Sequence, residues 1–231
     1  IHEQFHKLIY KKAKVPKRFS LFSNHEEIKN NVDFLFSVGG DGTLLETLTL
    51  IRDSGIPVMG INTGRLGFLS SIAKEEIDTA VDAVMKNKFS IDKRTLIRLE
   101  TKSKLFGKVN YALNEITLHK KDVSSMIKIH ASVNGEFLNS YFADGLIIST
   151  PTGSTAYSLS CGGPIVVPGS QNFIVTPVAP HNLNVRPIII SDEDVITLKM
   201  EDRNRNFLVS LDSRSAVIDA SAELTIRKEK F

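Results

Sequence analysis

The sequence predicts an α/β N-terminal domain, built on a parallel sheet with flanking helices, followed by a β-rich C-terminal domain. Two observations lead to this prediction. From residue 19 to about residue 90, short apolar runs alternate with segments of helical periodicity, which is the pattern of a parallel sheet. After about residue 91, apolar runs follow one another with turn signals between them. We therefore expect two domains, at residues 1–90 and 91–231.

The first strand and helix of the N-terminal domain are predicted on either side of a glycine-rich turn. Residues 33–38 read Asp-Phe-Leu-Phe-Ser-Val, a short apolar and aromatic run that indicates a buried strand. Gly55 stands where a C-cap glycine would end the helix that follows. The apolar residues of that helix fall on one face: Leu44, Leu45, Leu48 and Ile51.

A second strand and a second helix follow in the N-terminal domain. Residues 56–61, Ile-Pro-Val-Met-Gly-Ile, form another short apolar run that indicates a strand. Ile77, Val81 and Val84 are spaced by four and three residues, as on one face of an amphipathic helix. Glu75 and Glu76 would then lie in its first turn, where acidic side chains are favourable.

The C-terminal half is predicted to consist mainly of strands. Asn134-Gly135, a dipeptide favoured in tight hairpin turns, separates two of the apolar or alternating runs. No helix of any length is expected between the other runs. The predicted strands cover residues 127–133, 137–142, 146–149, 187–190, 195–200, 207–211 and 224–227.

Composition limits the class of protein. The single cysteine cannot form an intramolecular disulfide, and no apolar run approaches the roughly 18 residues that a membrane span needs. We therefore expect a cytoplasmic protein without a membrane partner. The net charge of +3 and the pI near 8.9 suit phosphorylated ligands but give little support for nucleic acid.

The glycine-rich turn at residues 39–43, Gly-Gly-Asp-Gly-Thr, is the first candidate site. Glycines let the backbone approach a phosphate, and the N–H groups of Gly42, Thr43 and Leu44, expected to be free at a helix start, favour anionic oxygens. A carboxylate among such donors opposes phosphate binding, so its natural task is to accept a proton from an attacking hydroxyl. Asp41 would be that base. Alternatively, the turn is purely structural and Asp41 caps the helix.

Familiar nucleotide-binding signatures are absent from this turn. The sequence contains no G-x-x-x-x-G-K-[ST], and Leu45 occupies the place of the third glycine of G-x-G-x-x-G. A P-loop enzyme and a simple dinucleotide-fold dehydrogenase are therefore not predicted.

Two polar clusters in the C-terminal half are further candidates. Asn114-Glu115 interrupts a strand-like run, and these side chains can donate to and accept from a vicinal diol such as a ribose. An edge-strand turn would explain the pair as well. Residues 144–158 end a strand in a run of hydroxyls and glycine that opens a short helix, which Gly162-Gly163-Pro164 ends. Tyr157 there offers a flat face for an adenine, although N-capping Thr and Ser in a loop would look the same.

Two weaker patterns lie in the N-terminal half. Residues 60–68 follow the second strand and carry a cation, Arg65, among glycines, where it could meet a phosphate or belong to a structural loop. His2-Glu3-Gln4-Phe5-His6 matches H-E-x-x-H, but no third zinc ligand is identifiable, so we predict no protein-bound metal.

Taken together, these motifs resemble those of the bacterial NAD kinase family. The glycine turn alone also occurs in diacylglycerol and sphingosine kinases. The whole set of motifs is therefore more specific for this family than the glycine turn by itself. The segments that carry the resemblance are residues 39–43, 114–115, 144–145, 150–158 and 162–164, together with Pro180-His181-Asn182-Leu183 and Arg186-Pro187.

The resemblance implies transfer of the γ-phosphate of ATP, or of inorganic polyphosphate in some members, to the 2′-hydroxyl of the adenosine ribose of NAD. It also implies a divalent metal, Mg²⁺ being the natural choice, and a homodimer or homotetramer. The motifs and the resemblance together give these candidate site residues: catalytic Asp41; substrate-binding Gly42, Asn114, Glu115, Asp144, Thr155, Ala156, Tyr157, Ser160 and Ala179; and phosphate-binding Gly39, Gly40, Thr43 and Arg65.

Two positions depart from the family pattern. Phe142 stands where many members have Arg, and Arg214 stands where several have Gln, so Arg214 either binds a phosphate differently or packs structurally. Two alternative functions stay open: a lipid kinase that shares the glycine turn, and a non-catalytic module that senses NAD.

Overall fold

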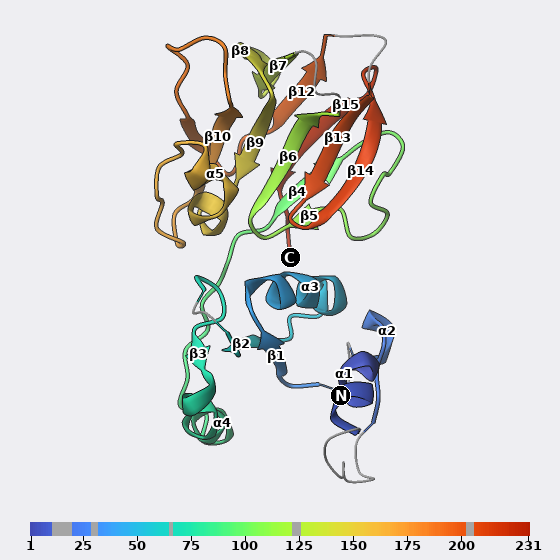
Figure 1. Ribbon diagram of the computed structural model, residues 1–231, viewed down its shortest axis with the longest axis vertical. Coiled ribbons are helices and arrows are strands. Elements are labelled where there is room, and N and C mark those ends of the chain that lie inside the picture. Colours follow the sequence, from blue (N-terminus) through green and yellow to red (C-terminus); the bar gives the residue numbers. More distant parts are fainter. Residues whose placement is uncertain (11–19, 29–31, 65–66, 122–125, 202–205) are drawn as a thin grey trace. The chain divides into compact units, whose positions relative to one another are not determined.

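The structure is a computed structural model that describes residues 1–10, 20–28, 32–64, 67–121, 126–201 and 206–231 (Figure 1). The chain forms two compact units, residues 1–91 and residues 92–230. Over the described residues, the N-terminal unit has one sheet and the C-terminal unit has two, and each unit has its own apolar cluster, so each is described by itself.

The N-terminal unit contains the predicted parallel sheet. Over the described residues its three strands, in the order β1-β2-β3, pair in parallel, with Leu35 opposite Val58. Ile28, Leu35 and Ile56 form the buried apolar cluster of this unit. The strands are β1 (Leu35–Gly39), β2 (Val58–Asn62) and β3 (Ile72–Ala73), and the helices are α1 (Glu3–Tyr10), α2 (His25–Ile28), α3 (Asp41–Ile51), the 3₁₀ turn η1 (Lys74–Glu76) and α4 (Ile77–Met85).

Helix α3 ends before the glycine that was expected to cap it. Its C-cap residue is Arg52, with a positive φ of 46°, and the Arg52 N–H donates to the Leu48 carbonyl at 3.1 Å. Gly55 also has a positive φ, 70°, but lies in the turn that leads to β2. The Arg52 side chain offsets part of the strain because its Nε donates to the Thr49 carbonyl at 3.1 Å.

The C-terminal unit consists of two antiparallel sheets over its described residues. Each has six strands, in the orders β11-β10-β9-β6-β13-β14 and β5-β4-β15-β12-β7-β8. The strands are β4 (Ile97–Glu100), β5 (Tyr111–Ala112), β6 (Glu115–Lys120), β7 (Ile127–Val133), β8 (Glu136–Ala143), β9 (Gly145–Ser149), β10 (Asn172–Val178), β11 (Ile188–Ser191), β12 (Ile196–Met200), β13 (Asn206–Leu211), β14 (Arg214–Asp219) and β15 (Glu223–Lys228); the only helical turns described are η2 (Thr152–Thr155) and α5 (Tyr157–Ser160).

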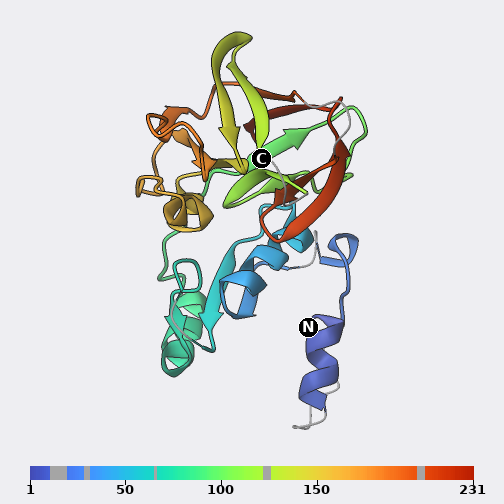
Figure 2. The same cartoon turned by 45° about the horizontal axis from the view of Figure 1, so that its top comes forward.

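The β7–β8 hairpin confirms the predicted Asn-Gly turn. Val133 pairs with Glu136, and the two residues between them have positive φ angles, 52° at Asn134 and 84° at Gly135. Both central residues of a type I′ turn need this conformation, which Asn and Gly adopt more readily than other residues. Figure 2 shows the hairpin as a long two-stranded projection.

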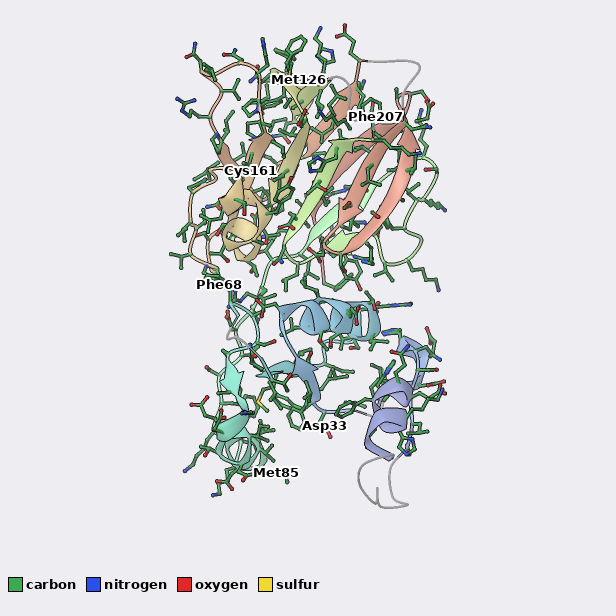
Figure 3. The ribbon with its side chains drawn as sticks, in the orientation of Figure 1. Asp33, Phe68, Met85, Met126, Cys161 and Phe207 are labelled. Carbon is green, nitrogen blue, oxygen red and sulfur yellow. The ribbon has the colours of Figure 1, made fainter. Side chains whose placement is uncertain are left out.

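Both sheets of the C-terminal unit contribute to one apolar core. Its largest fully buried side chains include Tyr141, Phe173 and Phe207, and Phe207 is labelled in Figure 3. Strand β9 lies between β6 and β10 and is buried along its whole length, whereas β7 alternates buried and half-buried residues. The core therefore fixes β6 and β9 firmly, and these two strands border the candidate site.

The chain changes sheets between β5 and β6. Tyr111-Ala112 pairs with β4 in one sheet, and Glu115 begins a strand that pairs with β9 and β13 in the other. The strand-like run around Asn114-Glu115 therefore forms two strands, β5 and β6, and Asn114 lies in the segment that connects them. The polar pair is therefore held between two sheets and not on a sheet edge.

None of the helices that the structure describes is long and apolar enough to cross a membrane.

Replacing the buried Phe207 ring tests the core. Phe207 is 1% exposed in β13, so Phe207→Ala should lower the free energy of unfolding by about 3–5 kcal/mol, since it removes a large apolar side chain and leaves a cavity. Val217→Ala on the neighbouring strand β14 is the control, because Val217 is 46% exposed. Denaturant unfolding of both variants would measure the difference, and equal effects would contradict the assigned core.

Candidate functional site

The glycine turn lies between β1 and α3, as predicted, but two of its N–H groups are already bonded. Gly40 is the N-cap of α3, and the N–H groups of Thr43 and Leu44 donate to its carbonyl at 3.1 and 3.3 Å. The expectation that these two amides are free for an anion is wrong, because the helix begins at Asp41 and they close its first turn.

The glycines of this turn serve two different purposes. A Cβ at Gly39 would lie 2.2 Å from Thr43 Oγ1, so Gly39 makes room for a side chain of its own helix. Gly40 and Gly42 have no atom within 4 Å of a Cβ placed on them. Their backbone is open to the approach of a ligand, whereas that of Gly39 is covered by the Thr43 side chain.

The Asp41 carboxylate bonds to a neighbouring turn and does not cap α3. Its Oδ2 accepts the N–H of Phe68 at 2.9 Å, and its Oδ1 accepts the N–H groups of Leu69 at 3.2 Å and Ser70 at 3.0 Å. Phe68, labelled in Figure 3, marks this turn between β2 and β3. The helix-cap interpretation of Asp41 is therefore wrong, because its oxygens face donors from another segment of the unit.

The loop that leads into this turn is organised by Asn62 at the end of β2. Asn62 is buried, and its Oδ1 accepts the Gly64 N–H at 2.7 Å while its Nδ2 donates to the Ser70 carbonyl at 3.4 Å. Arg65, the predicted phosphate-binding cation, lies outside the described residues.

In the C-terminal unit, two of the predicted clusters pack directly against each other. The Asn114 carbonyl accepts the Thr150 N–H at 2.9 Å, and the Thr150 hydroxyl donates to the Leu113 carbonyl at 2.5 Å. A Cβ at Gly153 would lie 2.0 Å from the Asn114 carbonyl oxygen, so only glycine permits this approach. The Asn114-Glu115 pair and the hydroxyl-rich segment thus lie in direct contact and form one candidate site.

Asp212 anchors this site, and the sequence analysis missed it. Its carboxylate accepts the N–H groups of Leu113 at 2.9 Å, Asn114 at 2.8 Å and Glu115 at 3.2 Å, and its own N–H donates to the Glu115 carbonyl at 3.1 Å. Burial raises the pKa of Asp212, and these hydrogen bonds oppose that shift. The signal in the sequence was an Asp between two strands, a residue type that tolerates the positive φ of 50° found there.

Glu115 is held in an environment that favours its neutral form. The residue is 9% exposed, and its Oε2 has no hydrogen-bond partner among the described residues. Burial, and then the nearby Asp212 charge, raise the pKa of Glu115 to about 8. At neutral pH this side chain is therefore mainly a carboxylic acid, which can donate a hydrogen bond to a ligand oxygen.

The hydroxyls of residues 150–160 divide into an inner and an outer set. Ser154 donates to the Pro151 carbonyl at 2.7 Å and Ser158 bonds the Thr176 hydroxyl at 2.8 Å, so both are used inside the fold with Thr150. The predicted substrate-binding members of the segment, Thr155, Ala156, Tyr157 and Ser160, are half-buried or exposed. The inner set shapes the segment, which leaves the outer set accessible.

Tyr157 stacks on a histidine that the sequence analysis did not select. The rings of His119 and Tyr157 lie 5.6 Å apart at 18°, and Tyr157 remains 37% exposed. A Cβ at Gly145 would lie 2.8 Å from His119 Nδ1, so this glycine makes room for the ring. Burial lowers the pKa of His119, which keeps its ring neutral beneath Tyr157. One face of Tyr157 is therefore covered by His119.

Asp144, just before β9, and Ala179, just after β10, lie close together where these two paired strands meet. The Asp144 N–H donates to the Val178 carbonyl at 2.9 Å, and the Asp144 carboxylate pairs with Lys120 at 2.5 Å. Ala179 is exposed and has a positive φ of 44°. A non-glycine residue in that conformation is strained, and such strain is concentrated at ligand-binding sites.

The two departures from the family pattern have separate structural explanations. Arg214 donates to the carbonyls of Val109 and Tyr111, which agrees with the structural alternative for this residue. Phe142 is 48% exposed, and Lys128 Nζ lies 5.4 Å from the centre of its ring. A cation is therefore present beside Phe142, although another residue supplies it.

Within the described part of the chain, no three His, Cys, Asp or Glu side chains are grouped as metal ligands. In the H-E-x-x-H segment, Glu3 instead forms an ion pair with Lys7 at 2.7 Å, and His2 packs edge-on against Phe22.

Comparison with known proteins gives one consistent family. Residues 4–89 match the family model of the ATP-NAD kinase N-terminal domain, and residues 113–229 match that of the ATP-NAD kinase C-terminal domain. A NAD kinase of Cytophaga hutchinsonii is 52% identical over 217 residues, which are 94% of this chain and 74% of that protein. A NAD kinase of Flavobacterium psychrophilum is 49% identical over 233 residues, 100% of this chain and 79% of that protein.

Two solved structures share the fold. A yeast NADH kinase complexed with NADH has a TM-score of 0.87 at 28% identity, covering 99% of this chain and 70% of that one. A NAD kinase from Archaeoglobus fulgidus in complex with ATP has a TM-score of 0.78 at 31% identity, covering 99% of this chain and 86% of that one. With both domains matched and about half of its residues identical to those of bacterial NAD kinases, this chain belongs to the NAD kinase family.

Proposed function

We propose that this chain transfers the γ-phosphate of ATP to the 2′-hydroxyl of the adenosine ribose of NAD, which yields NADP. The observation that carries the proposal is the match to NAD kinases over almost the whole chain, with the family's two domains in order. That match also argues against a lipid kinase, which shares only the glycine turn. A non-catalytic NAD sensor is distinguished by assay, since it would bind NAD without forming NADP.

Asp41 is the proposed general base. A carboxylate has about four acceptor positions, and the described residues fill three of them, two on Oδ1 and one on Oδ2. One position on Oδ2 is left for the 2′-hydroxyl proton. The three N–H donors also fix the plane of the carboxylate, so the base is oriented before the substrate arrives.

Asn114 and Glu115 are the proposed ribose contacts. The Asn114 amide offers both donors and an acceptor, and Glu115 in its neutral form offers a hydroxyl donor. A neutral Glu115 also avoids adding a second negative charge to a site that receives a phosphorylated dinucleotide. Asp144, Thr155, Ala156, Tyr157, Ser160 and Ala179 are the proposed adenosine contacts, with the uncovered face of Tyr157 available for stacking on adenine.

The open backbone of Gly40 and Gly42 is the proposed approach for the phosphates, with Gly39 and Thr43 shaping the turn. Among the described residues, no three His, Cys, Asp or Glu side chains are grouped so that they could hold Mg²⁺. We propose that it enters with the phosphates of ATP, as Mg²⁺ commonly does. We further propose a cytoplasmic homodimer or homotetramer, with NADH and polyphosphate as candidate alternative substrates.

Removing the negative charge of Asp41 tests the reaction. Asp41→Asn should lower turnover by at least roughly 10²-fold and leave NAD affinity nearly unchanged, because an amide cannot accept the hydroxyl proton. NADP formation with ATP and Mg²⁺, beside calorimetric titration with NAD, would measure both effects. Asp33→Asn is the matched control, since Asp33 is an exposed carboxylate just before β1 (Figure 3). Near-normal turnover in Asp41→Asn would remove the assigned role.

Glu115 should make stability depend on pH. The pKa of Glu115 is about 8 in the folded state, above the ordinary value of 4.5. The contribution of protonated Glu115 to the free energy of unfolding is therefore complete below about pH 4.5 and is lost as pH rises through 8. Glu115→Gln cannot ionise, so its stability relative to the parent chain should rise across this range, by on the order of 2–5 kcal/mol.

Thermal unfolding of the Glu115 variant and the parent chain between pH 5 and about pH 8.5 would measure this difference. Glu136→Gln, which alters an exposed carboxyl at the β7–β8 turn, is the control. A stability difference that stays constant with pH would contradict the buried, neutral Glu115.

A further inference from the structure

The turn at residues 67–70 fits around the Asp41 carboxylate on more than one side. A Cβ at Gly67 would lie 2.3 Å from Asp41 Oδ1, 2.4 Å from Oδ2 and 2.5 Å from Cγ, so the whole carboxyl group lies against the bare backbone of this glycine. The next three N–H groups of the chain then donate to its two oxygens. Successive N–H groups that converge in this way form a concave anion-binding seat.

The far end of the turn is firmly held. Ser70 is fully buried, and a Cβ at Gly60 would lie 2.8 Å from both Ser70 Cα and Leu44 Cδ1. The Ser70 carbonyl also accepts a hydrogen bond from the buried Asn62 at 3.4 Å. The turn is therefore wedged between β2 and α3 and has little freedom to move.

We infer that the 67–70 turn is a positioning element for phosphoryl transfer, with Gly67 as the residue on which the orientation of the base depends. The inference rests on the proposed function, since it takes Asp41 as the base. Gly67 and the three amides all face the Asp41 carboxyl group. They act through Asp41, whose carboxylate they hold in one plane with a single acceptor position left on Oδ2.

A methyl group at Gly67 should displace the base and leave the fold in place. The atoms that it would meet are the end of the Asp41 side chain, which can rotate, whereas the turn itself is held at Ser70. Misplacing a catalytic group by about 1 Å can cost on the order of 10²-fold in rate. A purely structural role for Gly67 would instead lower stability and affect binding and turnover together.

The test is the Gly67→Ala variant of the full chain, assayed for NADP formation from ATP and NAD. We expect kcat to fall roughly 10- to 10²-fold, with KM for both substrates changed by less than about 2-fold. In nuclear magnetic resonance spectra, the amide signals of Phe68, Leu69 and Ser70 should move toward their positions in Asp41→Asn. Gly64→Ala is the matched control in the same loop, since its Cβ would lie an ordinary 4.0 Å from Asn62 Oδ1.

A double substitution separates this inference from the proposed function. In the Asp41→Asn background, Gly67→Ala should reduce kcat little further, because the turn then has no base to hold. A normal kcat in Gly67→Ala with an impaired Asp41→Asn would overturn the positioning role and leave the proposed function intact. Additive losses in kcat, or a matching loss of thermal stability, would also overturn it. Normal turnover in Asp41→Asn would remove the base role of Asp41 on which this inference rests, whereas the proposed function itself fails only if the parent chain forms no NADP from ATP and NAD.

Discussion

The same interaction fixes irregular backbone in each of the two units: a carboxylate that accepts three consecutive backbone N–H groups. Asp41 does this for residues 68–70 in the N-terminal unit, and Asp212 does it for residues 113–115 in the C-terminal unit. Such bonds are charge-assisted and satisfy several main-chain donors at once, where no regular ladder can do so. Irregular backbone can therefore be held at the positions where ligands must approach.

The two carboxylates differ in what surrounds them, and the difference suits different tasks. Burial raises the pKa of both Asp212 and Glu115, and the charge of Asp212 raises the pKa of Glu115 further, so Glu115 takes a neutral form. Asp41 keeps one acceptor position beyond those used by the described residues. Asp212 therefore holds the backbone of a neighbouring neutral acid, whereas Asp41 retains an acceptor position, as the proposed base needs.

Much of this arrangement could be predicted from local sequence patterns. The strand before Gly39, the helices beginning near Asp41 and Ile77, and the Asn134-Gly135 hairpin all follow from periodicity and turn chemistry. Strands β4, β10 and β14 were missed. Strand β4 has only four residues, Pro177 interrupts β10, and the polar residues of β14 stand at its two ends and leave a short apolar run between them. The contacts of Asp212 with residues 113–115 and the stack of His119 on Tyr157 join distant segments, and no local pattern encodes which partner is reached across a sheet.

The glycines also show that the sequence alone does not give a residue's neighbours in space. The sequence predicted one purpose, ligand approach, for Gly39, Gly40 and Gly42. The Thr43 side chain occupies the space where a Gly39 side chain would lie, whereas the corresponding space at Gly40 and Gly42 is empty of protein atoms from the described residues. Gly67, Gly145 and Gly153 drew no separate argument, although each makes room for a functional group: the Asp41 carboxylate, the His119 ring and the Asn114 carbonyl. The reason why a position is occupied by glycine therefore becomes clear only when the group that packs against that glycine is known. In this chain the neighbour of a closely packed glycine is repeatedly a residue of the candidate site, because preorganised polar groups need close backbone support on at least one side.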